Sequence, residues 1–377
     1  MIKMKNNKIL IIALLFILLT LIPIKYNYAD DWSGKKGGYY TVYENNTDKI
    51  LFRISWDLNV NDQYLSHDNK MYKIIKVDKK NDKAYAKYIE TIKLPNIDID
   101  KVSQVMAQKT GERRIAMYST HSDESYIPTD GSSSIYGHGG IYHVDSSLSK
   151  ALEGKGIKTI VDRTLYLPHD AMAYRRSRVG AIKLLKNDRP DVLLDVHRDA
   201  APYQDYIRKI AGTNATGVRL VLGRTNANMK VNQDLAFRIK AIADKQYPNL
   251  VKDIFYGSGD YNQDLTPNSL LLEFGTDTHT RQRAEESAKF MADVLTKAVY
   301  GSDEKKQVGY LTNTQKSTPS QNRASGRGIW ILIGIAVFSI AGFMFLSTGG
   351  RELIYKFKNG TKKEFTSFLG RFKKDKK

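Results

Sequence analysis

Four side chains that can do hydrolytic chemistry stand directly after, or at the end of, apolar runs of the chain. His121 and Glu124 lie in "YSTHSDESY", which follows the apolar run "RIAMY". His197 ends "DVLLDVH", and Glu273 follows three leucines in "SLLLEFG". In open α/β sheets the ligand crevice lies outside the carboxyl ends of the strands. We therefore expect all four side chains to meet at one edge of a sheet.

Two imidazoles and a carboxylate are a common ligand set for hydrolytic zinc. The chain has no cysteine and only seven histidines, so a transition metal must be held by imidazole and carboxylate groups. We predict His121, Glu124 and His197 as Zn²⁺ ligands. Glu273 is the predicted general base, which takes a proton from zinc-activated water and passes it to the leaving nitrogen. No G-x-S-x-G elbow, H-E-x-x-H motif or Walker A loop is present.

Further polar residues lie close to these four in the sequence. His138, in the Gly-rich stretch "YGHGG", and His143, at the start of the next helix, stay open as alternatives for the middle ligand. Asp195 lies two residues before His197, so both point to one face of a strand, and Asp195 can orient the imidazole. Asp199 competes for that role. Other candidates for supporting the site or touching substrate are Arg198, Tyr261, Asn262 and Asp264.

The three remaining histidines are expected outside the site. His169 follows Pro168 and is expected to cap a helix, in a structural role. His279 is expected to be solvated, with a contact to substrate as the alternative, and His67 is expected at the surface of a β-rich region.

The elements that position these residues alternate between strands and helices from Arg114 to Ala298. Strands are expected at "RIAMYST", "IKTIVD", "DVLLDVH", "GVRLVLG" and "SLLLEFG", and helices at 146–153, 169–186, 232–245 and 280–298. This pattern predicts an α/β catalytic domain over 112–300, with a mixed, largely parallel sheet and helices on both faces. Residues 31–95 carry short Val-, Ile- and Tyr-rich runs broken by turn dipeptides, which predicts a small β-rich domain before it.

Hydrophobic segments flank these domains and predict membrane attachment. Residues 1–29 contain a lysine-led apolar run, which is a signal peptide or an N-terminal anchor, with cleavage near Ala29 slightly favoured. Residues 301–327 are rich in Ser, Thr, Asn and Gln and predict a flexible linker. The stretch 328–347 is long and apolar enough for a transmembrane helix, and 351–377 is a basic tail.

Charge predicts the orientation and the partners. Lysines before the first apolar run and the basic tail place both ends in the cytoplasm, so the catalytic domain is expected outside the cell membrane. The tail would attract anionic membrane lipids. The formal net charge of +19 would often indicate nucleic acid, but this topology keeps the domain away from it, and an anionic cell wall suits the external excess better.

Three motifs carry a resemblance to a known family. "YSTHSDESY", "RPDVLLDVHRDA" and "YNQDLTPNSLLLEFG", in this order and spacing, resemble the stage II sporulation protein P family of zinc-dependent N-acetylmuramoyl-L-alanine amidases. The resemblance covers about Arg114 to Ala298, and "DQYLSHDNKMYKIIKVD" looks like the region that precedes it in clostridial-type members. It implies an amidase-like fold.

The resemblance also implies a function and partners. His121 and His197 match the family's essential histidines, Glu273 its catalytic glutamate and Glu124 the glutamate after the first histidine. Related amidases take the middle ligand from the start of the next helix, where this chain has no glutamate, and that favours Glu124. The implied activity is cleavage of the N-acetylmuramoyl-L-alanine amide of peptidoglycan during septal remodelling and engulfment, with stage II sporulation proteins D and M. The alternatives are a stem-peptide endopeptidase using the same metal and a catalytically silent, wall-binding scaffold.

Overall fold

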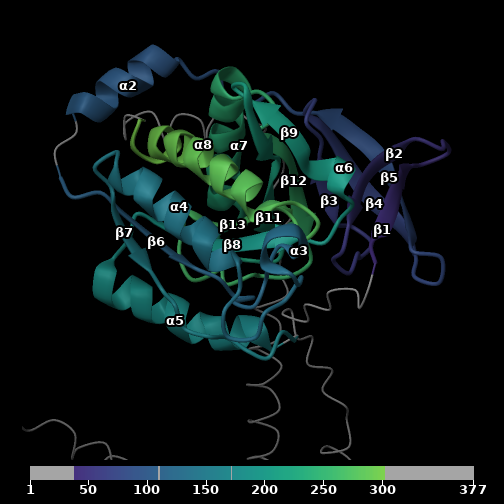
Figure 1. Cartoon of the computed structure of the whole chain (residues 1–377). Coiled ribbons are helices and arrows are strands. Elements are labelled where there is room, and N and C mark those ends of the chain that lie inside the picture. Colours follow the sequence, from purple (N-terminus) through teal and green to yellow (C-terminus); the bar gives the residue numbers. More distant parts are fainter. Residues whose placement is uncertain (1–37, 109–110, 171, 302–377) are drawn as a thin grey trace, which may run out of the picture. The chain divides into compact units, whose positions relative to one another are not determined.

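One eleven-stranded sheet runs through the molecule (Figure 1). The structure is a computed structural model, which describes residues 38–108, 111–170 and 172–301. Its strands are β1 (Tyr40–Glu44), β2 (Ile50–Ile54), β3 (Gln63–Leu65), β4 (Lys70–Asp78), β5 (Lys83–Thr91), β6 (Arg114–Tyr118), β7 (Lys158–Val161), β8 (Val192–Asp199), β9 (Ile207–Ile210), β10 (Thr213–Thr216), β11 (Val218–Gly223), β12 (Val251–Gly257) and β13 (Ser269–Thr276). Its helices are α2 (Ile99–Gln108), α3 (Ile127–Asp130), α4 (Ile141–Glu153), α5 (Ala173–Asp188), α6 (Tyr203–Tyr206), α7 (Met229–Gln246) and α8 (Arg281–Tyr300). The order across the sheet is β2-β1-β5-β4-β3-β12-β11-β13-β8-β6-β7, and β9 and β10 form a separate hairpin.

The α/β part of this sheet is mostly parallel. β7, β6, β8 and β13 run parallel in that order, β11 is antiparallel to β13, and β12 is again parallel to β11. In Figure 1, α4, α7 and α8 lie together on one face of the sheet and α5 lies on the other. The predicted mixed, largely parallel sheet with helices on both faces is therefore confirmed. Strand β12 was not expected, because Lys252 and Asp253 interrupt the apolar pattern of "VKDIFYG".

The β-rich segment is a lobe of this same sheet, made of β1 to β5. β3 pairs antiparallel with β12, and the whole segment belongs to the same compact unit as the α/β part. Leu65 and Met71 pack into the same core as Ile254. Strands form within the predicted β-rich segment 31–95, and this segment continues the sheet of the α/β part, because β3 covers the edge of β12.

Alternation along the strands sorts apolar and polar side chains onto opposite faces of the sheet. Alternate residues of β8 enter the core beneath α4, α7 and α8: Val192, Leu194 and Val196. Asp195, which stands between Leu194 and Val196, and His197, which follows Val196, therefore point to the other face, as do Glu273 of β13 and Arg219 of β11. On that face α5 covers one apolar cluster and the lobe covers another. The polar side chains lie between these two clusters.

The described residues contain no helix with the length and apolar character needed to cross a membrane. Both hydrophobic segments predicted from the sequence, within 1–29 and at 328–347, lie outside the described residues, as do the linker 302–327 and the basic tail 351–377.

Candidate metal centre

Three buried side chains, His121, Glu124 and His197, form a group that can hold a metal ion. One ligand atom from each lies within 4.8 Å of the others. Oε1 of Glu124 is 3.4 Å from Nδ1 of His121 and 3.4 Å from Nδ1 of His197. With bonds of about 2.1 Å, neighbouring ligand atoms of a tetrahedral zinc site are about 3.4 Å apart. The donor set and these two spacings therefore fit a tetrahedral ion.

Backbone contacts hold the glutamate in place. Glu124 lies in the loop that follows β6, and its Oε2 accepts a hydrogen bond of 2.9 Å from the backbone N–H of Arg198, one residue beyond His197. The side chain of Arg198 then donates to the carbonyl oxygens of Ser125 and Ser133. Arg198 thus fastens the β6 loop to the end of β8, which leaves the other oxygen of Glu124 directed at the two imidazoles.

Asp195 connects β8 to the same loop. Its two carboxylate oxygens accept hydrogen bonds from the backbone N–H and the hydroxyl of Thr120, at 2.9 and 2.6 Å. Nε2 of His197 lies 2.8 Å from Oδ1 of Asp195. The carboxylate therefore sits on the side of the imidazole away from Glu124, as expected for a residue that orients a ligand.

The charges of the group balance internally. Burial, with the neighbouring His169, lowers the pKa of His121 to about 3. Burial opposes the charged form of His197, but Asp195 and Glu124 outweigh it and raise its pKa well above the usual value. Burial also opposes ionisation of Glu124, yet the two histidines hold its pKa well below the usual range. The positive charge that holds down the pKa of Glu124 is the kind of charge that a bound metal ion would supply.

Glu273 lies beside this group on the neighbouring strand. It is the register partner of His197 in the parallel pair β13–β8, so both side chains point to the same face. The residue is 1% exposed, and its Oε2 has no hydrogen-bond partner within the described residues. Burial raises the pKa of Glu273 well above its usual value, and Asp199 adds to the effect. This carboxyl group is therefore well suited to binding and releasing a proton.

Asp199, at the end of β8, takes part in a buried charge network. Its carboxylate binds Ser55 of the lobe at 2.9 Å, the hydroxyl of Tyr206 at 2.8 Å and the guanidinium of Arg219 at 2.8 Å. Arg219 also makes two hydrogen bonds to Asp253, of 2.7 and 3.0 Å. The lobe is thus tied to the end of β8, two residues beyond His197.

The other predicted substrate residues build the loop before β13. Tyr261 packs its ring on Trp56 and is 7% exposed, and Asn262 donates to the carbonyl oxygen of Tyr174. Asp264 forms a two-pronged ion pair with Arg178, at 2.7 and 2.6 Å. None of the three belongs to the metal-competent group.

His138 and His143, the alternatives for the middle ligand, have exposed side chains and also lie outside that group.

The sequence reasoning missed His169, which lies against the site. Its ring stacks on His121 with centroids 4.0 Å apart, and its Nδ1 is 2.9 Å from Oδ1 of Asp123. The expected helix cap is not formed, because α5 begins only at Ala173. The loop that contains His169 follows the carboxyl end of β7, so the strand-end rule used for the other residues would have found it.

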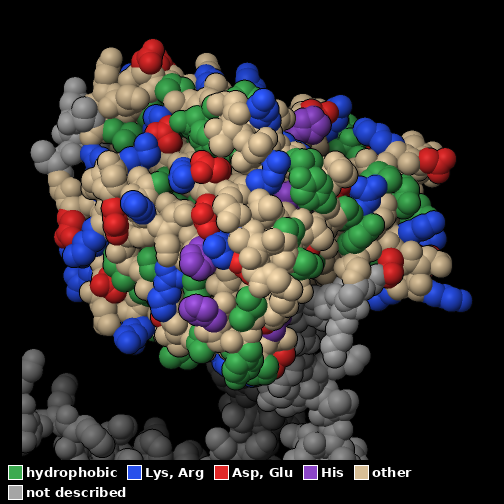
Figure 2. All heavy atoms as spheres, viewed as in Figure 1, with side chains coloured by type: hydrophobic (Ala, Val, Ile, Leu, Met, Phe, Trp, Pro, Cys, Tyr) green, Lys and Arg blue, Asp and Glu red, His purple; other side chains and the backbone are tan. Residues whose placement is uncertain are grey.

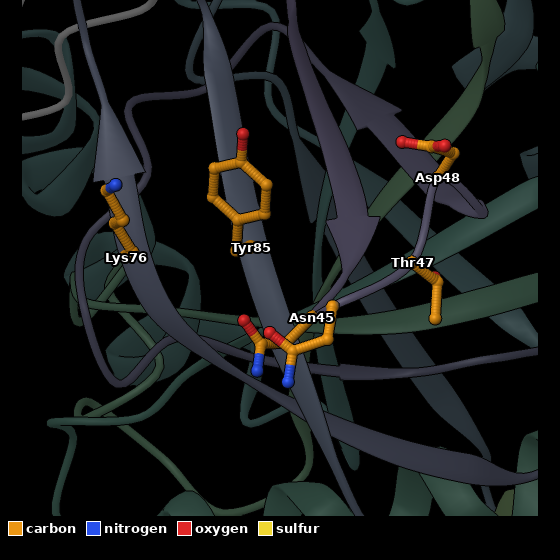
Figure 3. A pocket seen from close by; sticks show the side chains of 6 residues that line it. Asn45, Thr47, Asp48, Lys76 and Tyr85 are labelled. Carbon is orange, nitrogen blue, oxygen red and sulfur yellow. The ribbon is translucent and has the colours of Figure 1, made fainter.

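Away from this site, a cavity of about 360 Å³ lies in the lobe (Figure 3). Lys76 and Tyr85 line it from β4 and β5, and the turn after β1 supplies the rest: Asn45, Asn46, Thr47 and Asp48. None of these residues belongs to the metal-competent group. On the face drawn in Figure 2, basic and acidic side chains are interspersed and no region of one sign dominates.

Comparison with known proteins identifies relatives. A family model described as stage II sporulation protein P matches residues 43–296. Stage II sporulation protein P of Bacillus subtilis (strain 168) is 28% identical over 215 residues, which are 52% of this chain and 54% of that protein. The chain thus spans about half the length of this curated relative.

Among solved structures, an N-acetylmuramoyl-L-alanine amidase from Clostridium difficile 630 is 16% identical with a TM-score of 0.34, covering 55% of this chain and 100% of that one. The CwlD amidase from Clostridioides difficile, solved in complex with the GerS lipoprotein, is 12% identical with a TM-score of 0.34, covering 53% of this chain and 98% of that one.

Proposed function

Because the chain belongs to the stage II sporulation protein P family, we propose that it is a zinc-dependent peptidoglycan hydrolase of sporulation. The bond it cuts is the amide between N-acetylmuramic acid and L-alanine. The observation that carries this proposal is the buried group of His121, Glu124 and His197 with Glu273 beside it. Two imidazoles and a carboxylate, with a separate carboxyl group nearby, are the parts that metal-assisted amide hydrolysis needs.

In this proposal His121, Glu124 and His197 hold the zinc ion. When bound, the ion lowers the pKa of a water molecule to about 7 and polarises the scissile carbonyl. Asp195 orients the ring of His197 from the opposite side. The backbone N–H of Arg198 keeps the second oxygen of Glu124 occupied, so that the first stays directed at the metal position.

Glu273 moves the proton. It takes a proton from the attacking water as the oxygen bonds to the carbonyl carbon, and gives it to the amide nitrogen as the C–N bond breaks. Its raised pKa supports this role, because a carboxyl group that binds a proton more tightly can hold the proton from water until the amide nitrogen takes it. General acid–base catalysis of this kind contributes roughly 10² to 10⁴ in rate.

The proposal places the hydrolase at the cell membrane, with its catalytic part outside. The apolar segments within 1–29 and at 328–347, and the basic residues next to them, support this topology. We further propose that it works in a membrane complex with stage II sporulation proteins D and M, and that the basic tail 351–377 binds anionic lipids from the cytoplasmic side.

The decisive test is Glu273→Gln in the purified full chain, assayed on isolated peptidoglycan sacculi. The expected result is a fall in wall solubilisation of about 10³-fold, with one zinc ion per chain still bound, because the amide cannot carry a proton between oxygen and nitrogen. Glu286→Gln is the matched control, since Glu286 pairs with Lys289 on the surface of α8. Wall solubilisation that persists in Glu273→Gln while zinc remains bound contradicts the assignment.

Mass spectrometry of the released fragments separates the alternatives. Freed lactyl groups on the glycan are the products of the amidase. New amino groups on stems still linked to glycan would instead indicate an endopeptidase with the same metal. Binding to the wall with no new ends of either kind would indicate the scaffold.

A further inference from the structure

One aromatic ring projects into solvent close to the metal-competent group. Tyr136 is 83% exposed, the largest fraction for any large hydrophobic side chain in the part of the chain that the structure describes. Single exposed apolar residues are ordinary on protein surfaces, so the surroundings decide whether this one has a use.

Tyr136 lies in a loop that is fastened to the metal-binding loop on both sides of it. Before it, the N–H of Ile135 donates to the carbonyl oxygen of Asp123 at 2.9 Å. After it, the N–H of Gly139 donates to the carbonyl oxygen of Ser122 at 3.2 Å. Ser122 and Asp123 stand between His121 and Glu124, so the backbone on either side of Tyr136 is fastened to the loop that carries the proposed zinc ligands.

Close packing shows that this arrangement is specific. A Cβ atom on Gly139 would lie 2.5 Å from the carbonyl oxygen of Ser122 and 2.7 Å from that of Glu124, so only glycine allows the two loops to approach so closely. The loop therefore presents Tyr136 from a fixed backbone.

A second exposed apolar side chain, Leu165, reaches the same place from the loop after β7. Leu165 is 47% exposed, and its Cδ1 is 3.6 Å from the Cβ position of Gly137, the residue next to Tyr136. The next residue, Tyr166, donates its backbone N–H to the hydroxyl of Ser122 at 3.2 Å. Exposed apolar residues of two adjoining loops, Tyr136 and Leu165, thus flank the loop that carries His121 and Glu124, and we refer to this pair as the apolar platform.

We propose that this platform, Tyr136 with Leu165, binds a sugar ring of the glycan strand next to the cleaved muramoyl unit, an inference that rests on the proposed hydrolase function. A pyranose ring has an apolar face of C–H groups and a rim of hydroxyls, which matches an exposed aromatic ring with polar neighbours. Ser132 and His138, exposed on the same loop, supply such neighbours. The stem peptide carries carboxylates and would require a cation, which the platform does not contain.

Co-sedimentation with purified insoluble peptidoglycan tests this subsite. The full chain in detergent carries Glu273→Gln, so that the polymer is not consumed. Adding Tyr136→Ala should raise the apparent Kd for peptidoglycan roughly tenfold, because the apolar contact of one ring face is lost. Tyr136→Trp should keep the affinity. Tyr88→Ala is the matched control, because Tyr88 is 41% exposed on β5 in the lobe.

Two results would overturn the proposal. The first is an apparent Kd of the Tyr136→Ala protein within twofold of that of the Glu273→Gln parent. The second is an equal loss of affinity in the Tyr88→Ala protein. Competition identifies the occupant: peptide-free glycan chains should displace the Tyr136-dependent binding, and displacement by free stem peptide instead would also refute it. Failure of the hydrolase proposal would appear separately, as wall solubilisation that survives Glu273→Gln, whatever the sedimentation result.

Discussion

Replacing Arg219 by methionine should lower the free energy of unfolding by about 4 kcal/mol. The guanidinium is 1% exposed, binds Asp253 through two hydrogen bonds and binds Asp199 through a third. Burial opposes ionisation of Asp253, but Arg219, helped by Lys252, holds its pKa at about 2. That shift from 3.8 corresponds to about 2 kcal/mol, and leaving Asp199 buried without its cation adds about 2 kcal/mol.

Urea and thermal unfolding of the two proteins at pH 7 measure the effect. A loss of about 4 kcal/mol should lower the Tm by roughly 10 °C. The Tm of Arg219→Lys should lie between those of the wild type and Arg219→Met, because lysine keeps the charge but not the two-pronged geometry. Lys230→Met is the control, because Lys230 is 66% exposed and 3.9 Å from Asp234, and its loss should change stability by less than about 0.5 kcal/mol. If Arg219→Met costs less than about 1 kcal/mol, the guanidinium does not hold this network together.

Three further outcomes are expected. Burial raises the pKa of Asp145 to about 7, so the folded protein binds this proton more tightly and loses stability as the pH rises from about 4 to 7. The free energy of unfolding of Asp145→Asn, relative to that of the wild type, should therefore rise by about 4 kcal/mol between pH 4 and pH 8. If urea melts show the same difference between the two proteins across that range, the reasoning is refuted. Gly139→Ala should lower metal affinity in a competitive chelator titration, and should lower the free energy of unfolding by about 1 to 3 kcal/mol, because its Cβ would lie 2.7 Å from the carbonyl oxygen of Glu124. Gly154→Ala is the control, because its Cβ would come no closer than 3.5 Å to another atom, and it should change neither quantity. Asp195→Asn should weaken zinc binding by about 10- to 100-fold in the same titration, and unchanged affinity would mean that this carboxylate does not orient the imidazole.

The metal-competent group and Glu273 could be predicted from the sequence because they lie at, or in the loop directly after, the carboxyl part of a recognisable strand. His197 ends a run of apolar residues, and Glu273 follows three leucines, so both positions are marked locally. Parallel neighbours then place those ends together, which the register of β8 and β13 confirms. The roles of these residues as ligands and base stay predictions.

No local sequence pattern identified the residues whose contacts are with residues distant in the sequence. His169 lies 48 positions from His121 in the sequence, yet their rings stack at 4.0 Å. Lys252 and Asp253 made β12 look like a polar segment, because their partner Arg219 comes from another strand. Asp264 was predicted as a residue that touches substrate, but its carboxylate forms an ion pair with Arg178 on α5.

Local sequence pattern determines the kinds of element, their order along the chain and the faces on which polar side chains lie. The reason is that the periods of strand and helix depend only on neighbouring residues. The tertiary structure alone decided that the β-rich segment continues the same sheet, and that Ser55 of this lobe binds Asp199, two residues beyond His197 of the metal-competent group. Edge pairing and buried charge pairing join residues that are far apart in sequence. Their energies depend on burial and distance in the folded chain, which no local pattern contains.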